Sequence, residues 1–140
     1  FGSLLAYTAG VFKTLVNYEN IPLKISIDGK IIELKSLLIA IANGKYYGGG
    51  MMPAPTARID DGILDICLIK EMDRLTILKF FPSFIKGRHG NVEGVYFYRA
   101  SRIEVECGRD VALNVDGEVE IVRHAVFEVI PSGIRLVVPV

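Results

Sequence analysis

The last third of the chain constrains the fold most strongly, because short apolar runs there alternate with turn residues. Asp116-Gly117 and the Pro-Ser-Gly triplet at 131–133 supply turns between these runs. Six runs follow one another, at residues 95–98, 103–107, 111–115, 119–123, 126–130 and 134–138. Short strands at this spacing are typical of antiparallel sandwiches and barrels. We therefore expect a mainly β fold, an antiparallel β-sandwich with one or two helices, and a single domain over residues 1–140.

The middle of the chain predicts further strands. Two alternating runs, at residues 23–27 and 31–34, flank Asp28-Gly29. This dipeptide predicts a tight hairpin, because both central positions of a type I′ turn need positive φ. Residues 37–42 form a continuous apolar run, which predicts a strand buried on both faces. Residues 63–69 predict another strand.

Two segments carry a helical pattern instead. Residues 1–18 place apolar side chains three and four positions apart, which predicts an amphipathic helix. Asp73 has the residue type of an N-cap, and it precedes a predicted helix that contains Leu75, Leu78 and Phe81. We expect Pro82 to kink this second helix or to start a new turn.

Charge and hydropathy exclude several classes of protein. The chain has 16 basic residues (Lys and Arg) and 16 acidic residues (Asp and Glu). This balance argues against binding nucleic acid through its phosphates. No apolar run is long enough to span a bilayer. The mean hydropathy of +0.38 indicates a large core or an apolar surface that a partner covers. Cys67 and Cys107 lie far apart in apolar runs, so we expect reduced, buried packing residues in a cytoplasmic protein.

A glycine-rich loop, NGKYYGGGMMPAP at residues 43–55, is the first candidate for chemistry. Three consecutive glycines let the backbone approach a ligand closely or adopt positive φ. The loop lacks the Gly-Lys-Ser/Thr ending of a P-loop and the G-x-G-x-x-G spacing of a dinucleotide site. A tight loop without a ligand explains the same residues.

Two acidic turns are the next candidates. Asp61, together with the carbonyls of Arg58 and Ile63, offers oxygen ligands for a hard cation, although a plain turn former explains it as well. In Asn114-Val115-Asp116-Gly117-Glu118, strand alternation predicts that Asn114, Asp116 and Glu118 point broadly to the same side of a hairpin tip. Glu118 could act as a general base there or be an ordinary solvated acid.

Two histidines complete the set of candidate residues. His89 lies in a loop, where it either contacts a substrate or phosphate or is merely exposed. His124 shows no pattern of partners. No catalytic triad can be built from two histidines placed in this way.

These signals occur together, and in the same order, in one family. The motifs NGKYYGGGMMPAPTARIDDGILDICLI, KGRHG, LNVDGE and VIPSGIRLVVP resemble the C-terminal half of bacterial lipid kinases. This is the family of diacylglycerol kinases, sphingosine kinases and related lipid kinases. The likeness covers about residues 24–139, nearly the whole chain.

The resemblance implies an active site between two domains. One is a nucleotide-binding α/β domain with a Gly-Gly-Asp-Gly-Thr motif, and the other is a β-sandwich. The resemblance puts the catalytic base at Glu118, which accepts the proton of a lipid hydroxyl as that oxygen attacks the γ-phosphoryl group of ATP. It puts Mg²⁺ on Asp61 and on the backbone carbonyls of Arg58 and Ile63.

One departure from the family pattern is large, since no Gly-Gly-Asp-Gly-Thr sequence occurs in the 140 residues. We therefore expect this chain, which starts at Phe1 rather than Met, to be the C-terminal domain of a longer kinase. Its N-terminal domain would bind most of the ATP, and the isolated chain would be inactive. A nicotinamide-dinucleotide kinase domain and a non-catalytic β-sandwich binding module remain as alternatives.

The resemblance also implies partners. The expected acceptor is a membrane lipid with a free hydroxyl, such as diacylglycerol. Membrane contact would be peripheral, at the inner membrane face, through apolar loop residues such as Met51 and Met52, for which a place in the core is the alternative. The helix at residues 1–18 is expected to pack on the sandwich or to mediate a homodimer.

Overall fold

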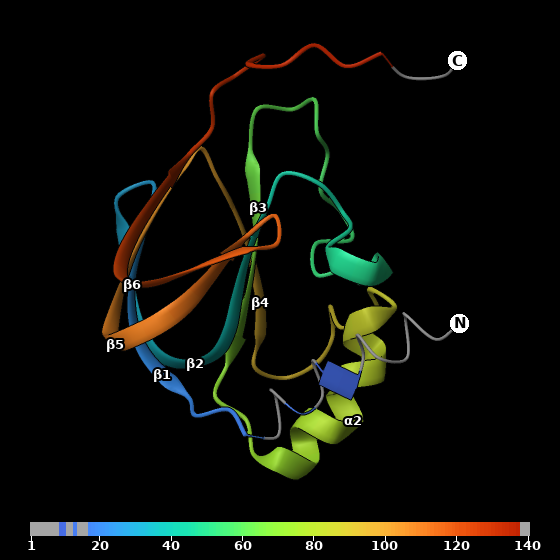
Figure 1. Ribbon diagram of the computed structural model, residues 1–140, viewed down its shortest axis with the longest axis vertical. Coiled ribbons are helices and arrows are strands. Elements are labelled where there is room, and N and C mark those ends of the chain that lie inside the picture. Colours follow the sequence, from blue (N-terminus) through green and yellow to red (C-terminus); the bar gives the residue numbers. More distant parts are fainter. Residues whose placement is uncertain (1–8, 11–12, 14–16, 138–140) are drawn as a thin grey trace.

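The strands form a single antiparallel sheet in the computed structural model, which describes residues 9–10, 13 and 17–137 (Figure 1). The order of the six strands across the sheet is β4-β3-β2-β1-β5-β6. The strands are β1 (Ile21–Ile27), β2 (Lys30–Ala42), β3 (Leu64–Lys70), β4 (Val95–Ala100), β5 (Arg102–Val115) and β6 (Glu118–Glu128). The helices whose full extent lies in the described residues are α2 (Arg74–Ile85) and the short 3-10 helix η1 (Gly48–Gly50). The expected mainly β, sandwich-like architecture is confirmed.

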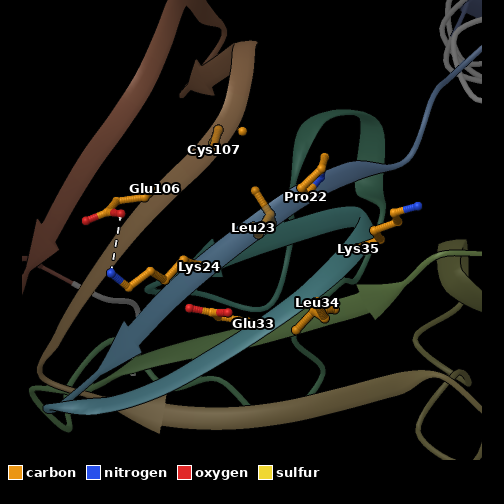
Figure 2. A pocket seen from close by; sticks show the side chains of 9 residues that line it. Pro22, Leu23, Lys24, Glu33, Leu34, Lys35, Glu106 and Cys107 are labelled. Atoms are coloured by element: carbon orange, nitrogen blue, oxygen red, sulfur yellow. Dashed lines mark ion pairs between the residues drawn. The ribbon is translucent and has the colours of Figure 1, made fainter.

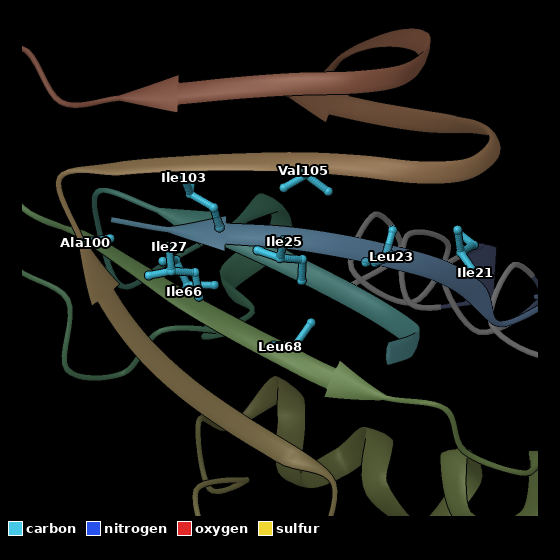
Figure 3. Packing of buried hydrophobic residues seen from close by; sticks show 9 residues of the cluster. All are labelled: Ile21, Leu23, Ile25, Ile27, Ile66, Leu68, Ala100, Ile103 and Val105. Carbon is cyan, nitrogen blue, oxygen red and sulfur yellow. The ribbon is translucent and has the colours of Figure 1, made fainter. Parts of the chain in front are cut away.

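The sheet buries apolar side chains on both of its faces. On one face, side chains of β1, β3 and β5 form a core that is largely isoleucine, leucine and valine (Figure 3). On the other face, α2 packs Ile77, Phe80 and Phe84 against Cys67 and Ile69 of β3. Layers of this kind let a sheet bury both faces without a second complete sheet.

The hairpin of β1 and β2 has the predicted turn. Asp28 and Gly29 have φ of 45° and 88°, the positive values that a two-residue type I′ turn needs. The Asp28 carboxylate also accepts hydrogen bonds from the hydroxyl of Ser101 (3.2 Å) and the backbone N–H of Arg102 (3.1 Å). One side chain therefore ties the first hairpin to the connection between β4 and β5.

The apolar run at 37–42 is less buried than predicted. Leu37 is buried, but the residues that follow it to the end of β2 are half-buried. The reason lies in the strand pairing. β1 pairs with β2 only as far as Ser36, so the rest of β2 has β3 as its single neighbour.

The C-terminal third contains fewer and longer strands than predicted. The runs at 103–107 and 111–115 are joined in β5, where the pairing with β6 shifts register between Glu106 and Val111. The runs at 119–123 and 126–130 are likewise joined in β6, which ends at Glu128, so residues 129–130 lie outside the strand. The strand predicted at 134–138 is wrong over its described residues, since 134–137 form no strand and Ile134 and Val137 are exposed.

The predicted N-cap of α2 is confirmed. The Asp73 carboxylate accepts hydrogen bonds from the backbone N–H groups of Leu75 (3.0 Å) and Thr76 (3.1 Å). The helix continues through Pro82 to Ile85, so it is one helix and not two. The helix predicted at 1–18 lies mostly outside the described residues, although positions 9, 10 and 13 are helical. Among the described residues, none of the helices is long and apolar enough to span a membrane.

Candidate functional site

Glu118 lies at the tip of the hairpin formed by β5 and β6. Asp116 and Gly117 have φ of 51° and 99°, so this turn has the same positive-φ geometry as the first hairpin. The backbone N–H of Gly117 donates to Oδ1 of Asn114 at 2.9 Å, which holds the turn together. Glu118 is the first residue of β6, directly after this turn.

Strand register gives the direction of the Glu118 side chain. Glu118 pairs with Val115, whereas Asn114 pairs with Val119. Paired residues share a face of a sheet and successive residues alternate, so Asn114 and Glu118 lie on opposite faces. The prediction that they point to one side is therefore wrong. Glu118 is exposed, and within the described part of the chain its carboxylate has no hydrogen bond or ion pair.

The second predicted site is the turn that contains Asp61. Oδ1 of Asp61 accepts a hydrogen bond from the backbone N–H of Ile63 at 3.1 Å. Oδ2 accepts from the guanidinium of Arg99 on β4. The side chain of Arg58 instead binds both carboxylate oxygens of Asp60, at 3.1 and 3.3 Å. Only the backbone carbonyl of Arg58 is therefore a candidate metal ligand.

The donors of this turn fit Mg²⁺ chemically, because one carboxylate and two carbonyls are hard oxygen ligands. Arg99 competes for the same carboxylate and also lies 3.5 Å from the buried Asp65. Burial raises the pKa of Asp65, while Arg99 opposes that rise and the Asp61 carboxylate adds to it. The turn thus concentrates negative charge that a cation can balance, and in this structure Arg99 balances it.

The glycine-rich loop at 43–55 folds back on itself. The backbone N–H of Tyr47 donates to the carbonyl of Met51 at 2.8 Å, and Gly49 and Gly50 have φ of 69° and 90°. Positive φ at these two positions explains why glycine is used there. Met51 is buried against the α2 side of the sheet, and Met52 is half-buried, so the structure does not support membrane contact through Met51.

His89 is neither an exposed loop residue nor a surface contact for a substrate. Its side chain is fully buried, and Nε2 lies 3.0 Å from the carbonyl oxygen of Pro53. Since a carbonyl only accepts, Nε2 carries the proton. The imidazole also packs near the rings of Phe84 and Phe97 and lies 3.7 Å from Sγ of Cys67. His89 thus fastens the end of the glycine-rich loop to the core under α2.

The sequence offered one indication that His89 is buried, namely the phenylalanines that surround its side chain. Phe80, Phe84 and Phe97 all lie within 6.1 Å of the imidazole, measured between ring centroids. Residues 80 and 84 are one helical turn apart, so they lie on the same face of the helix. The sequence around His89 did not indicate that this histidine packs against that face.

The two cysteines differ in burial. Cys67 is fully buried, as predicted, and burial raises the pKa of its thiol to about 12. Cys107 is only half-buried, and burial raises its pKa as well. Cys107 borders a groove of about 490 Å³ that crosses β1, β2 and β5 (Figure 2). The ion pair of Lys24 and Glu106, at 3.7 Å, lies at this groove, which contains no predicted catalytic residue.

His124, for which the sequence showed no pattern of partners, forms a hydrogen bond with Glu104. Its Nε2 lies 2.8 Å from a carboxylate oxygen of Glu104, at the exposed surface of the pair β5 and β6. The hydrogen bond from His124, with a smaller contribution from Arg102, lowers the pKa of Glu104. In the described residues no hydrogen bond or ion pair joins Glu118 to the Asp61 turn or to either histidine.

Comparison with known proteins identifies the domain. The family described as the YegS C-terminal NAD kinase beta sandwich-like domain matches residues 2–138. The chain belongs to this family. A diacylglycerol kinase of Mycobacterium tuberculosis is 27% identical over 136 residues, which are 96% of this chain and 44% of that protein. A protein of Shewanella frigidimarina, described as a YegS-like lipid kinase, is 35% identical over 71% of this chain and 32% of its own length.

A solved structure agrees with the sequence relatives. The crystal structure of a protein from Bacillus anthracis, assigned as a diacylglycerol kinase, superposes with a TM-score of 0.68 at 27% identity. The match covers 89% of this chain and 43% of that one. The YegS-family chain therefore spans less than half the length of the relatives that it matches.

Proposed function

We propose that this chain is the acceptor-side domain of an ATP-dependent lipid kinase and that Glu118 is the general base. The observation that carries the proposal is the free carboxylate of Glu118 at the tip of a well-defined hairpin. A base must reach the proton that it removes and must not be neutralised by a partner. The names of the relatives, which are diacylglycerol and lipid kinases, support this chemistry.

In the proposed reaction, the carboxylate of Glu118 accepts the proton of a lipid hydroxyl. The hydroxyl oxygen then forms a bond with the γ-phosphorus of ATP, and the bond from that phosphorus to the β,γ-bridging oxygen breaks, releasing ADP. Transfer of a phosphoryl group depends mostly on positioning and on charge stabilisation, so the base supplies one part of the catalysis.

We assign the carboxylate of Asp61 and the backbone carbonyls of Arg58 and Ile63 to Mg²⁺. When bound, the ion would supply positive charge at the turn that enters β3. Arg99 would then have to release Asp61, while keeping its contact with Asp65. The proposed role of this turn is to fix the shape of the chain where it enters β3, next to β4.

The remaining parts of the kinase belong outside these 140 residues. The relatives are more than twice as long as the matched region, which supports a separate N-terminal domain that binds ATP. We propose that the isolated chain is inactive, and that the whole kinase works in the cytoplasm at the inner membrane face.

The test is a kinase assay on the parent protein with Glu118→Gln. Loss of a general base lowers kcat by about a hundredfold or more. Glu120→Gln is the matched control, because Glu120 is also exposed and lies two residues further along the same strand. Equal activity of Glu118→Gln and wild type on every acceptor would remove Glu118 from the base role.

The choice of acceptor separates the proposal from its alternatives. Diacylglycerol and NAD are offered side by side to the wild-type parent. Phosphorylation of diacylglycerol supports the lipid kinase, and phosphorylation of NAD identifies a nicotinamide-dinucleotide kinase instead. Phosphorylation of neither would favour a non-catalytic binding module.

A further inference from the structure

The outward face of α2 exposes leucines. The helix turns its buried side, which includes Ile77, Phe80 and Phe84, towards the sheet (Figure 1). On the other side, Leu75 is 69% exposed and Leu78 is 39% exposed. Leucines one turn apart on an otherwise solvated helix face leave apolar area open to a partner.

The same region is rich in positive charge. From residue 74 to residue 92 the chain contains four basic residues and no Asp or Glu, although its total charge is zero. All four are exposed, and no ion pair of the described residues involves them: Arg74, Lys79, Lys86 and Arg88. The nearest acids in sequence flank this region: Asp73, the N-cap of α2, precedes it and Glu93 follows it. Four cations therefore stand between two acids, and no ion pair of the described residues neutralises them.

We propose that the outward side of α2 and the turn that follows it, which together carry Leu75 and Leu78 with Arg74, Lys79, Lys86 and Arg88, dock the domain onto an anionic bilayer. The inference rests on the proposed function, because an acceptor lipid with long acyl chains stays in a membrane. A helix with leucines and uncompensated Lys and Arg on one face is typical of interfacial binding. Each basic side chain near an anionic surface adds attraction, and the leucines enter the headgroup region.

Charge complementarity favours a bilayer over a second copy of this chain. A symmetric contact of α2 with itself would bring four unpaired cations on each side together, which is repulsive. An anionic lipid surface instead neutralises them all and accepts two leucines without any matching pocket.

A tryptophan reporter tests the contact directly. The chain has no Trp, so Leu75→Trp introduces a single fluorophore on the proposed surface. Ile121→Trp on β6 is the matched control, because Ile121 is also 69% exposed. We expect vesicles of an equal mixture of phosphatidylglycerol and phosphatidylcholine to shift the emission of Leu75→Trp to the blue and to leave Ile121→Trp unchanged. Phosphatidylcholine vesicles should shift neither variant.

A charge variant gives a second readout. Lys79→Gln combined with Lys86→Gln should lower the vesicle partition coefficient at least tenfold, since each basic residue contributes roughly fivefold. Lys24→Gln combined with Lys30→Gln removes the same charge from the hairpin of β1 and β2 and should have a much smaller effect. Cosedimentation with the mixed vesicles measures both.

Three outcomes would overturn the proposal. If the mixed vesicles do not shift the emission of the Leu75→Trp variant, this surface does not contact the membrane. Equal loss of binding in both double variants shows that total charge, and not α2, attracts the chain. Blue-shifted emission of Leu75→Trp before vesicles are added, with a sedimentation mass above the monomer, assigns the face to self-association. None of these results bears on Glu118, whose role is tested by kinase turnover.

Discussion

At the scale of single residues, the structure separates the polar side chains that hold the domain together from those that remain available. His89 and Asp28 each make hydrogen bonds that join segments far apart in sequence. Glu118 makes none within the described residues, and it is the residue that we propose as the general base. Free polar groups at a hairpin tip cost little because water solvates them, so function can occupy that position.

His89 provides the first prediction. His89→Phe keeps an aromatic ring but leaves the carbonyl of Pro53 without a donor, whereas His89→Gln can still donate to it. An unpaired buried acceptor costs about 1–3 kcal/mol, so the Phe variant should be the less stable of the two. Urea denaturation measures this difference. Hydrogen exchange should also speed up in the loop at 43–55 of the Phe variant, and equal exchange in both variants would contradict the proposed anchor.

Asp61 provides a second prediction. Mg²⁺ should raise the melting temperature of the wild-type domain, because a ligand that binds only the folded state stabilises it. Asp61→Ala should abolish the rise, and Arg99→Gln should enlarge it by removing the competing cation. Asp60→Ala, which loses only the exposed contact with Arg58, is the control. If Mg²⁺ does not change the melting temperature of the wild-type domain, Asp61 is only a turn residue.

At the scale of elements, local chemistry decides where strands turn and helices begin. Asp28-Gly29 and Asp116-Gly117 both form turns with two positive φ values, and Asp73 caps α2. These features were predictable because each depends on residues only a few positions apart. The lengths of β5 and β6 were not, because their continuity depends on pairing across the sheet, which absorbs the interruption at Gly108 as a shift in register.

Gly117 gives the prediction at this scale. Gly117→Ala places a side chain at φ of 99°, which should destabilise the domain by about 1 kcal/mol or more. Gly90→Ala is the control, because its added Cβ also meets nothing within 4 Å and its φ is not in the positive range. Thermal denaturation compares the two. Equal melting temperatures would show that the tip of the hairpin does not contribute to stability.

At the scale of the whole molecule, one face of the sheet carries an aliphatic core contributed by its own strands, and α2 packs against the other face (Figure 1). Two ionisable side chains, those of Cys67 and Tyr18, lie in or against these cores. Burial raises the pKa of both Cys67 and Tyr18 to about 12. Both groups are neutral when protonated, so the folded state holds its protons at a pH where the unfolded chain has lost them.

The stability of the domain should therefore fall in alkali. The ordinary pKa values are 9.0 for Cys67 and 10.0 for Tyr18, and the folded values are about 12. Below pH 9 both states bind these protons, and stability is unaffected. As the pH rises from 9 towards 12 the unfolded chain binds fewer protons, and the free energy of unfolding decreases. Urea titrations across this range measure the slope, which Cys67→Ala should reduce. An unchanged slope in that variant would exclude Cys67 as a cause.

The sequence by itself determined the mainly β class, the turns at Asp28-Gly29 and Asp116-Gly117, the cap of α2 and the family, because each depends on neighbouring residues or on short ordered motifs. Tertiary structure decided the burial of His89, the half-burial of the end of β2 and the opposite directions of Asn114 and Glu118. It also decided that residues 134–137 form no strand. These features depend on which strands pair and in which register, and long-range pairing is a property of the folded sheet that no local pattern contains.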